Sequence, residues 1–230
     1  MDIFNPNNQL EFFNSFAEKY DKADRFTLGL GKKINRNVIG RSDIPSGKTV
    51  CDLMCGDGKN IPFILDKLKC KKVYAVDFSE AMINKAKRKY ADSKIIFLNE
   101  NSLHLSIPDS TVDAVTCTFG IKTLKLSDQE LLLKEINRIL KPGGIFVIAE
   151  ISKPIKKIPL AFSYLFFNGL LEMESFVFNY KFIRRKFLWR YIDAFGSAKM
   201  MGEYAVTIFS NAEFFSWYGG IITGISGRKN

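Results

Sequence analysis

The stretch VCDLMCGDGKNI at residues 50–61 contains two pairs of residues that could carry chemistry. Cys51 and Cys55 could belong to a metal or redox centre. Gly56 and Gly58 follow an apolar run, and glycines in such a place let a ligand approach the backbone closely. Residues elsewhere in the chain decide between a thiol centre and a cofactor-binding loop.

The cysteines lack the partners that a metal or redox centre requires. The chain has four cysteines and a single histidine, His104, and no two cysteines have CxxC spacing. A zinc site would need nearly all of these thiols together with distant carboxylates, so no metal site is expected. Free thiols suit a reducing compartment, and the first residues do not resemble a signal peptide. We therefore expect a cytoplasmic protein.

The glycines do have an acidic partner downstream. Asp77 ends the β-rich run KKVYAVDF (71–78), and an acidic group in this place can accept both ribose hydroxyls of a bound nucleoside. A dinucleotide fingerprint would have a third glycine where Ile61 stands, and no P-loop lysine or serine follows the glycines. The pattern therefore favours a nucleoside cofactor and argues against NAD and against ATP hydrolysis.

The elements that must position these residues alternate along the chain between strands and helices. Ser79 is a candidate N-cap for the helix that follows Asp77. Such alternation predicts a parallel sheet with helices on both faces, in which ligands bind outside the carboxyl ends of the strands. The predicted strands cover 49–55, 71–78, 94–100, 112–120 and 144–151, and helices are predicted over 59–70, from Ser79 onward, and over 126–140.

The remaining segments complete a single predicted domain of 230 residues. Residues 1–46 are expected to form an N-terminal helical lid, and 47–154 the cofactor-binding core. Residues 155–202 are rich in aromatic side chains and are interpreted as a helical cap inserted before the last strands. Residues 203–230 hold those strands, predicted at 205–210 and 220–226 as an antiparallel edge hairpin.

The net charge of +10 could attract a nucleic acid or an anionic membrane surface. The lysines are spread widely, and no RNP-type aromatic signature accompanies them, so nucleic acid is not favoured as a partner. The aromatic cap allows two interpretations. Its side chains could form only a core, or they could line a pocket for a lipophilic acceptor, with Arg184, Arg185 and Lys186 favouring a membrane surface.

In their order along the chain, these motifs resemble class I S-adenosylmethionine (SAM) dependent methyltransferases. More narrowly, they resemble the C-methyltransferases of ubiquinone and menaquinone biosynthesis. The resemblance implies a Rossmann-like, doubly wound, mostly parallel seven-stranded sheet with an antiparallel C-terminal edge hairpin. The segments that carry it are FNSFAEKYD (13–21), VCDLMCGDG, VYAVDFSEAMINKAKRK, IPDSTVDAVTCTFGI, INRILKPGGIFVIAEISKP and GGIITGISGRK.

The resemblance implies a SAM site at the carboxyl ends of the strands. Gly56 and Gly58 would flank the methionine part of SAM, with Cys55 as a small residue beside it. Asp52 would orient this loop and the amino group of SAM, and Asp77 would bind the ribose.

Further contacts follow from the same resemblance. Asn101 and Ser102 stand where the family has an Asp-Ala pair that forms a hydrogen bond with the adenine amine. Asn101 keeps the acceptor oxygen of the aspartate but lacks its charge. The other implied contacts are Phe78 and Met82 beside the adenine, Thr118 and Phe119 at the methionine end, and Tyr20 closing over the cofactor.

The catalytic residues are less clearly marked. Lys122 stands where the family usually has Arg and is a candidate for stabilising a phenolate, Glu150 matches the family's Glu, and Tyr20 could bridge cofactor and substrate. The chain departs from the family in its substrate-facing stretches, where GKKIN (31–35) lacks the expected His, Arg and Trp, and IKT (121–123) replaces apolar-Arg-Asn.

We therefore predict a SAM-dependent methyltransferase that methylates a small, lipophilic, aromatic or quinol-like acceptor, at carbon. Transfer to O or N of a specialised metabolite and a SAM-binding enzyme that does not methylate remain alternatives. An RNA methyltransferase is disfavoured because CTFG (117–120) stands where amino-methylating enzymes carry Asn/Asp-Pro-Pro-Tyr. A homodimer and a peripheral contact with a membrane surface are left open.

Overall fold

The computed structural model describes residues 2–17, 30–41, 43–154, 156–165 and 187–230. Within these residues, seven strands form one sheet in the order β3-β2-β1-β4-β5-β7-β6. The first five strands pair in parallel, and the last two are antiparallel, which confirms the predicted fold. The strands are β1 (Thr49–Leu53), β2 (Lys72–Asp77), β3 (Ile95–Asn99), β4 (Val112–Thr118), β5 (Leu140–Ile151), β6 (Ser210–Trp217) and β7 (Ile222–Arg228).

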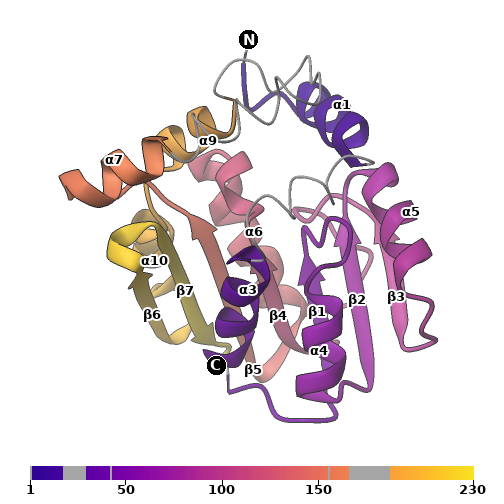
Figure 1. Cartoon of the computed structure of the whole chain (residues 1–230). Helices are drawn as coiled ribbons and strands as arrows, with labels where there is room; N and C mark the ends of the chain where they lie inside the picture. Colours follow the sequence, from indigo (N-terminus) through magenta and orange to yellow (C-terminus); the bar gives the residue numbers. More distant parts are fainter. Residues whose placement is uncertain (1, 18–29, 42, 155, 166–186) are drawn as a thin grey trace.

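Helices cover both faces of the sheet because the inner strands carry apolar side chains on each face. In β1, Cys51 and Leu53 pack into a cluster with α6 and α10, whereas Val50 packs into a second cluster with α4 and α5. The helices of the two layers are α3 (Leu30–Arg41), α4 (Ile61–Leu68) and α5 (Glu80–Lys89) on one face, and α6 (Leu126–Ile139) and α10 (Lys199–Ala205) on the other (Figure 1).

The start of α5 shows how the sequence sets an element boundary. Ser79 has an extended backbone, and its side-chain oxygen accepts the backbone N–H of Met82 at 3.2 Å. This N-cap satisfies one of the N–H groups that the first turn of a helix leaves unpaired. Because β2 ends at Asp77, the cap fixes the turn from strand to helix at the edge where the site is expected.

The remaining described helices lie toward the carboxyl ends of the parallel strands (Figure 1). They are α1 (Pro6–Phe16), the 3₁₀ turn η2 (Ile121–Thr123), α7 (Lys157–Leu165), α9 (Phe187–Phe195) and the 3₁₀ turn η4 (Tyr218–Gly220). Helices were predicted in 1–46 and 155–202; residues 18–29 and 166–186 of these segments lie outside the described residues. The division of the chain into lid, core and cap stays a prediction. No helix among the described residues is long and apolar enough to cross a membrane.

The strand predicted at 205–210 is wrong. Ala205 is the last residue of α10, and the N–H groups of Ile208 and Phe209 donate to its carbonyl at 3.1 and 2.9 Å, which closes a turn. Two of the apolar side chains that suggested a strand are instead buried in the core, those of Ala205 and Phe209, and the Phe209 ring packs on Phe146 with centroids 4.4 Å apart. The edge strand β6 begins only at Ser210, and β7 runs from 222 to 228 rather than from 220 to 226.

Candidate functional site

The carboxyl ends of three neighbouring strands bring the predicted cofactor residues together. β1 pairs in parallel with both β2 and β4, with Leu53 opposite Val76 on one side and Cys117 on the other. The loops that follow these strands therefore leave the sheet side by side. They contain Cys55, Gly56 and Gly58 after β1, Phe78 and Ser79 after β2, and Phe119 after β4.

The glycine loop has one open side and one packed side. Gly56 has a φ of +55°, and a Cβ added to it would meet no atom within 4 Å. Gly58 has a φ of +81°, and a Cβ there would lie 2.8 Å from the Ile61 side chain and 2.9 Å from the Tyr90 ring. Glycine adopts such backbone angles at little cost, whereas most residues with a side chain are strained there. Gly56 thus borders space that a ligand can occupy, whereas Gly58 allows the loop to pack on its neighbours.

Asp52 is the centre of a buried polar cluster below this loop. Its Oδ1 accepts from Asn60 Nδ2 at 2.9 Å and from Thr116 Oγ1 at 2.7 Å, while its Oδ2 has no hydrogen-bond partner. Asn60 Nδ2 also donates to Thr118 Oγ1 at 2.9 Å, which links the loop after β1 to the end of β4. Burial raises the pKa of Asp52 to about 6. A buried carboxylate oxygen without a partner is costly unless a donor or cation binds to it.

Two members of this cluster, Asn60 and Thr116, were not predicted from the sequence as site residues. Asn60 stands directly before α4, where a polar residue normally caps the helix, yet its side chain makes no capping bond there. Thr116 lies inside β4, where threonine is an ordinary strand residue. Neither residue type marks a binding site by itself, and only the folded arrangement shows that both bond to Asp52.

Asp77 ties the glycine loop to the start of α5. Its Oδ2 accepts the backbone N–H of Gly56 at 2.8 Å and its Oδ1 that of Ser79 at 2.9 Å. The side chain is buried, and burial raises its pKa to about 6. A carboxylate has about four acceptor positions, so two remain for the hydroxyls of a ligand.

The residues predicted beside the adenine follow β2 and β3. The Phe78 ring packs edge-on against Phe13 of α1, with centroids 5.7 Å apart, and Met82 is buried at the start of α5. Ser102 is buried, whereas Asn101 is exposed, and its Oδ1 accepts the N–H of Leu103 at 3.0 Å. Tyr20 lies outside the described residues.

Helix α1 is held on α5 next to this position. Asn14 Oδ1 accepts from Ser79 Oγ at 2.7 Å, and Lys85 Nζ donates to the carbonyl oxygen of Ala17. These two contacts fix the C-terminal end of α1 against α5.

Lys122 and Glu150 form a buried ion pair after β4 and at the end of β5. Lys122 Nζ lies 3.1 Å from Glu150 Oε1 and also donates to the carbonyl oxygen of Phe119, and the Lys122 N–H donates to Glu150 Oε2 at 3.0 Å. Ile151 N–H donates to Glu150 Oε1 at 2.7 Å. The structure thus brings two predicted catalytic residues together, with the cation of one bound to the carboxylate of the other.

The thiols of the opening stretch do not form a reactive centre. Cys51 and Cys55 are both buried, and burial raises the pKa of each thiol well above its usual value. A raised pKa keeps cysteine in the unreactive thiol form. Among the described residues, no group of three or more His, Cys, Asp and Glu side chains could hold a metal ion.

Comparison with known proteins shows the family of this chain. A family model described as "ubiE/COQ5 methyltransferase family" matches residues 4–229. The chain belongs to this family. It is 31% identical over 175 residues to the ubiquinone/menaquinone biosynthesis C-methyltransferase UbiE of Escherichia coli, an alignment that covers 73% of this chain and 68% of UbiE. The protein is therefore a SAM-dependent methyltransferase, as the sequence resemblance predicted.

Solved structures share the fold at lower sequence identity. A SAM-dependent methyltransferase from Aquifex aeolicus superposes with a TM-score of 0.60 at 20% identity, covering 94% of this chain and 98% of that one. Phosphoethanolamine N-methyltransferase 2 of Haemonchus contortus, in complex with SAM, gives a TM-score of 0.57 at 19% identity, covering 80% of this chain and 38% of that one. At these sequence identities, the structural similarity shows that the chain shares the fold of these methyltransferases.

Proposed function

We propose that this methyltransferase binds SAM over Gly56, at the carboxyl ends of β1, β2 and β4, and methylates a carbon atom of a lipophilic, quinol-like aromatic acceptor. The observation that supports the cofactor site most strongly is the Oδ2 of Asp52, a buried acceptor without a hydrogen-bond partner four residues before Gly56, whose own Cβ position is open. The positively charged amino group of SAM is a suitable donor for it. Asp77 would hold the ribose through its remaining acceptor positions.

The other contacts of this site follow from the placement of the loops. Thr118 and Phe119 leave β4 beside the glycine loop and would border the methionine end, with Cys55 as a small neighbour. The adenine side would be bordered by residues that follow β2 and β3: Phe78, Met82, Asn101 and Ser102. Tyr20 would close over the cofactor from the segment after α1.

SAM supplies a methyl group on a sulfonium, ready for in-line displacement, when the acceptor is aligned with it. The protein must therefore position the acceptor and favour its electron-rich form. In a quinol-type ring, loss of a phenolic proton makes the adjacent carbon nucleophilic, and a nearby cation stabilises the phenolate.

Lys122 is the cation that we assign to this role. An ammonium group has three N–H donors, and two of them bind Glu150 and the Phe119 carbonyl. The third remains to bind an acceptor oxygen, while Glu150 holds the ammonium in place. Glu150 is thus a positioning residue, and Lys122 is the residue that would touch the substrate.

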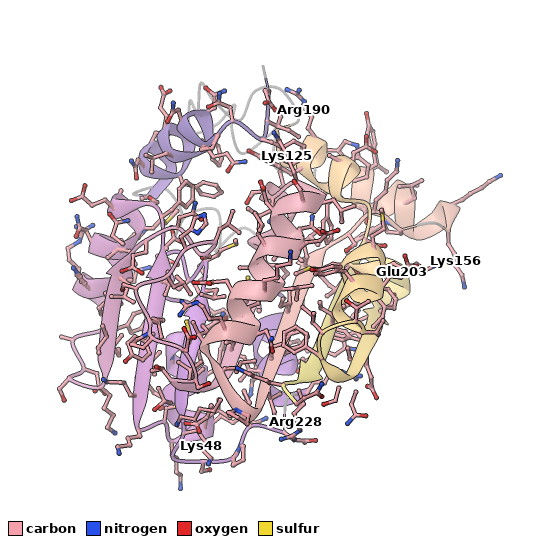
Figure 2. The ribbon with its side chains drawn as sticks, turned by 180° about the vertical axis from the view of Figure 1, so that it is seen from behind. Lys48, Lys125, Lys156, Arg190, Glu203 and Arg228 are labelled. Atoms are coloured by element: carbon pink, nitrogen blue, oxygen red, sulfur yellow. The ribbon has the colours of Figure 1, made fainter. Side chains whose placement is uncertain are left out.

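A lipophilic acceptor would reach the site from a membrane surface. At the end of the molecule where α9 contacts η2, the basic residues Lys125 and Arg190 lie together, whereas Lys48 and Arg228 lie at the opposite end (Figure 2). Helix α7 exposes 60% of Phe162 and 68% of Leu165. Apolar and basic side chains together suit the interface of an anionic bilayer. The quinol-like acceptor is further supported by the name of the UbiE relative.

Two measurements test this proposal. Isothermal titration with SAM should show binding in the micromolar range, and no heat at high micromolar concentration would contradict the site. Next, a cell extract is incubated with the enzyme and SAM that carries a deuterated methyl group, and lipids and polar metabolites are analysed by mass spectrometry. We expect a labelled lipid quinone whose label stays on a ring carbon after hydrolysis. A label on oxygen or nitrogen, or in the polar fraction alone, would contradict carbon methylation of a lipophilic acceptor.

A further inference from the structure

The end of helix α5 contacts the packed side of the glycine loop. Lys89 is the last residue of α5, and its Nζ lies 2.6 Å from Asp57 Oδ2. Tyr90 is the C-cap, and its ring lies 2.9 Å from the position that a Cβ on Gly58 would take. Two consecutive residues thus touch two consecutive residues of the loop.

The Lys89–Asp57 contact compensates a charge inside the protein. Asp57 is fully buried, and its Oδ1 has no hydrogen-bond partner, whereas 30% of the Lys89 side chain is exposed. If the lysine is removed, a buried carboxylate is left uncompensated between Gly56 and Gly58, and such a group must move or recruit water. A movement that extends to the backbone of Asp57 would also displace Gly56 and Gly58, the residues bonded to it on either side.

The same carboxylate acts on its neighbour Asp77. Burial is the main cause that raises the pKa of Asp77, and the charge of Asp57 raises it further. Asp77 in turn accepts the N–H of Gly56. The charge of Asp57 therefore affects the position of the glycine loop in two ways: through the backbone that joins Asp57 to both glycines, and through the Asp77 carboxylate that binds the Gly56 N–H.

We propose that Lys89 and Tyr90 are positioning residues that set the affinity for SAM by holding Asp57 and Gly58 in place. They act through the loop and do not touch the cofactor. The proposal rests on the SAM site over Gly56 that is proposed above. It assigns to the last turn of α5 a role beyond covering the sheet.

Titration calorimetry with SAM on the full chain tests this role through a double-mutant cycle. We expect Lys89→Met to raise the Kd about tenfold, whereas Lys89→Arg, which can still reach the carboxylate, stays within about threefold of wild type. In an Asp57→Asn background, Lys89→Met should change the Kd less than about twofold, because no buried charge is left uncompensated. The matched control is Lys87→Met, an exposed position of the same helix with the same loss of charge, which should bind SAM as the wild type does.

A second pair of variants keeps the test valid if Lys89→Met does not fold. Tyr90→Phe keeps the ring on Gly58 and should bind SAM within about threefold of wild type, whereas Tyr90→Ala should raise the Kd about tenfold. Equal affinities for Lys89→Met and Lys87→Met, or an equal effect of Lys89→Met with and without Asp57→Asn, would overturn the role of Lys89. Equal affinities of the two Tyr90 variants would overturn the role of Tyr90. Failure of the wild type itself to bind SAM would instead overturn the site over Gly56.

Discussion

Replacing Asp52 with asparagine should separate the binding of SAM from the stability of the fold. The change keeps the shape of the side chain and an oxygen for Asn60 and Thr116, but it removes the buried negative charge. Oδ2, the atom without a partner, becomes an amide nitrogen. If Asp52 serves the cofactor, the variant should lose affinity for SAM without losing stability at neutral pH.

The pKa of Asp52 gives the size and sign of the stability effect. Burial raises this pKa from 3.8 to about 6, so ionisation favours the unfolded chain. A raised carboxyl pKa means that the ionised group costs up to about 3 kcal/mol above pH 6, a cost that fades as the pH falls toward the unfolded value. The difference in unfolding free energy, Asp52→Asn minus wild type, should therefore grow by about 2 kcal/mol between pH 4.5 and pH 7.5.

Asp52→Asn should weaken the binding of SAM, although it raises the unfolding free energy at neutral pH. A hydrogen bond to a charged group contributes about 1.5–3 kcal/mol, which corresponds to a roughly 10- to 100-fold weaker Kd for SAM in the variant. Urea denaturation at several pH values gives the first quantity, and titration calorimetry gives the second.

Asp113→Asn is the matched control for this substitution. Burial would raise the pKa of Asp113, but the Thr49 N–H and Lys141 outweigh burial and lower it. Its ionised form therefore stabilises the fold, and Asp113→Asn should lower stability at pH 7.5 and leave SAM binding unchanged. The reasoning on Asp52 is refuted if Asp52→Asn binds SAM like the wild type, or if its stability relative to wild type falls as the pH rises.

Three further outcomes are expected. Gly56→Ala should lower the unfolding free energy by about 1–2 kcal/mol, because alanine is strained at a positive φ, and should weaken SAM binding more than about tenfold. Gly143 also has a positive φ, +74°, and open space around it, so Gly143→Ala should show the same loss of stability without the loss of binding. Equal affinities of these two variants for SAM would contradict the site. Lys122→Met should lower the unfolding free energy measured in urea by about 3–5 kcal/mol, because the buried carboxylate of Glu150 loses its compensating cation. Lys122→Met combined with Glu150→Gln should recover most of this loss, and no recovery would count against the pair. SAM affinity measured by calorimetry should fall below pH 6 as Asp77, whose pKa burial raises to about 6, becomes protonated, and a constant Kd from pH 5 to 8 would oppose this role.

The parts of the fold that hydrophobic patterns determine were predictable. Apolar runs bounded by glycines gave the parallel strands, and the side chain of Ser79 caps α5 as expected. The adjacency of Gly56 and Asp77 also followed, because the carboxyl ends of parallel strands meet at one edge. These features depend on local sequence and on a general rule of sheet topology.

The parts that depend on tertiary contacts were not predictable. Asn60 looks like a helix cap in sequence but bonds to Asp52, because α4 begins directly over the buried end of β1. Lys122 was predicted as a cation for the substrate, and only the structure shows that Glu150 already binds it. Residues 205–210 contain strand-forming side chains but form a turn, from which Phe209 is buried in the core. In each case a distant partner determines what the side chain does.

A crystal structure with S-adenosylhomocysteine, the product left by SAM after methyl transfer, tests the central claim most directly. We predict that the amino group of the ligand lies within hydrogen-bonding distance of Asp52 Oδ2 or of a water bound to it. The homocysteine chain should lie over Gly56 and the ribose hydroxyls on Asp77. A ligand bound elsewhere on the chain, or one that leaves the glycine loop uncovered, would contradict the account.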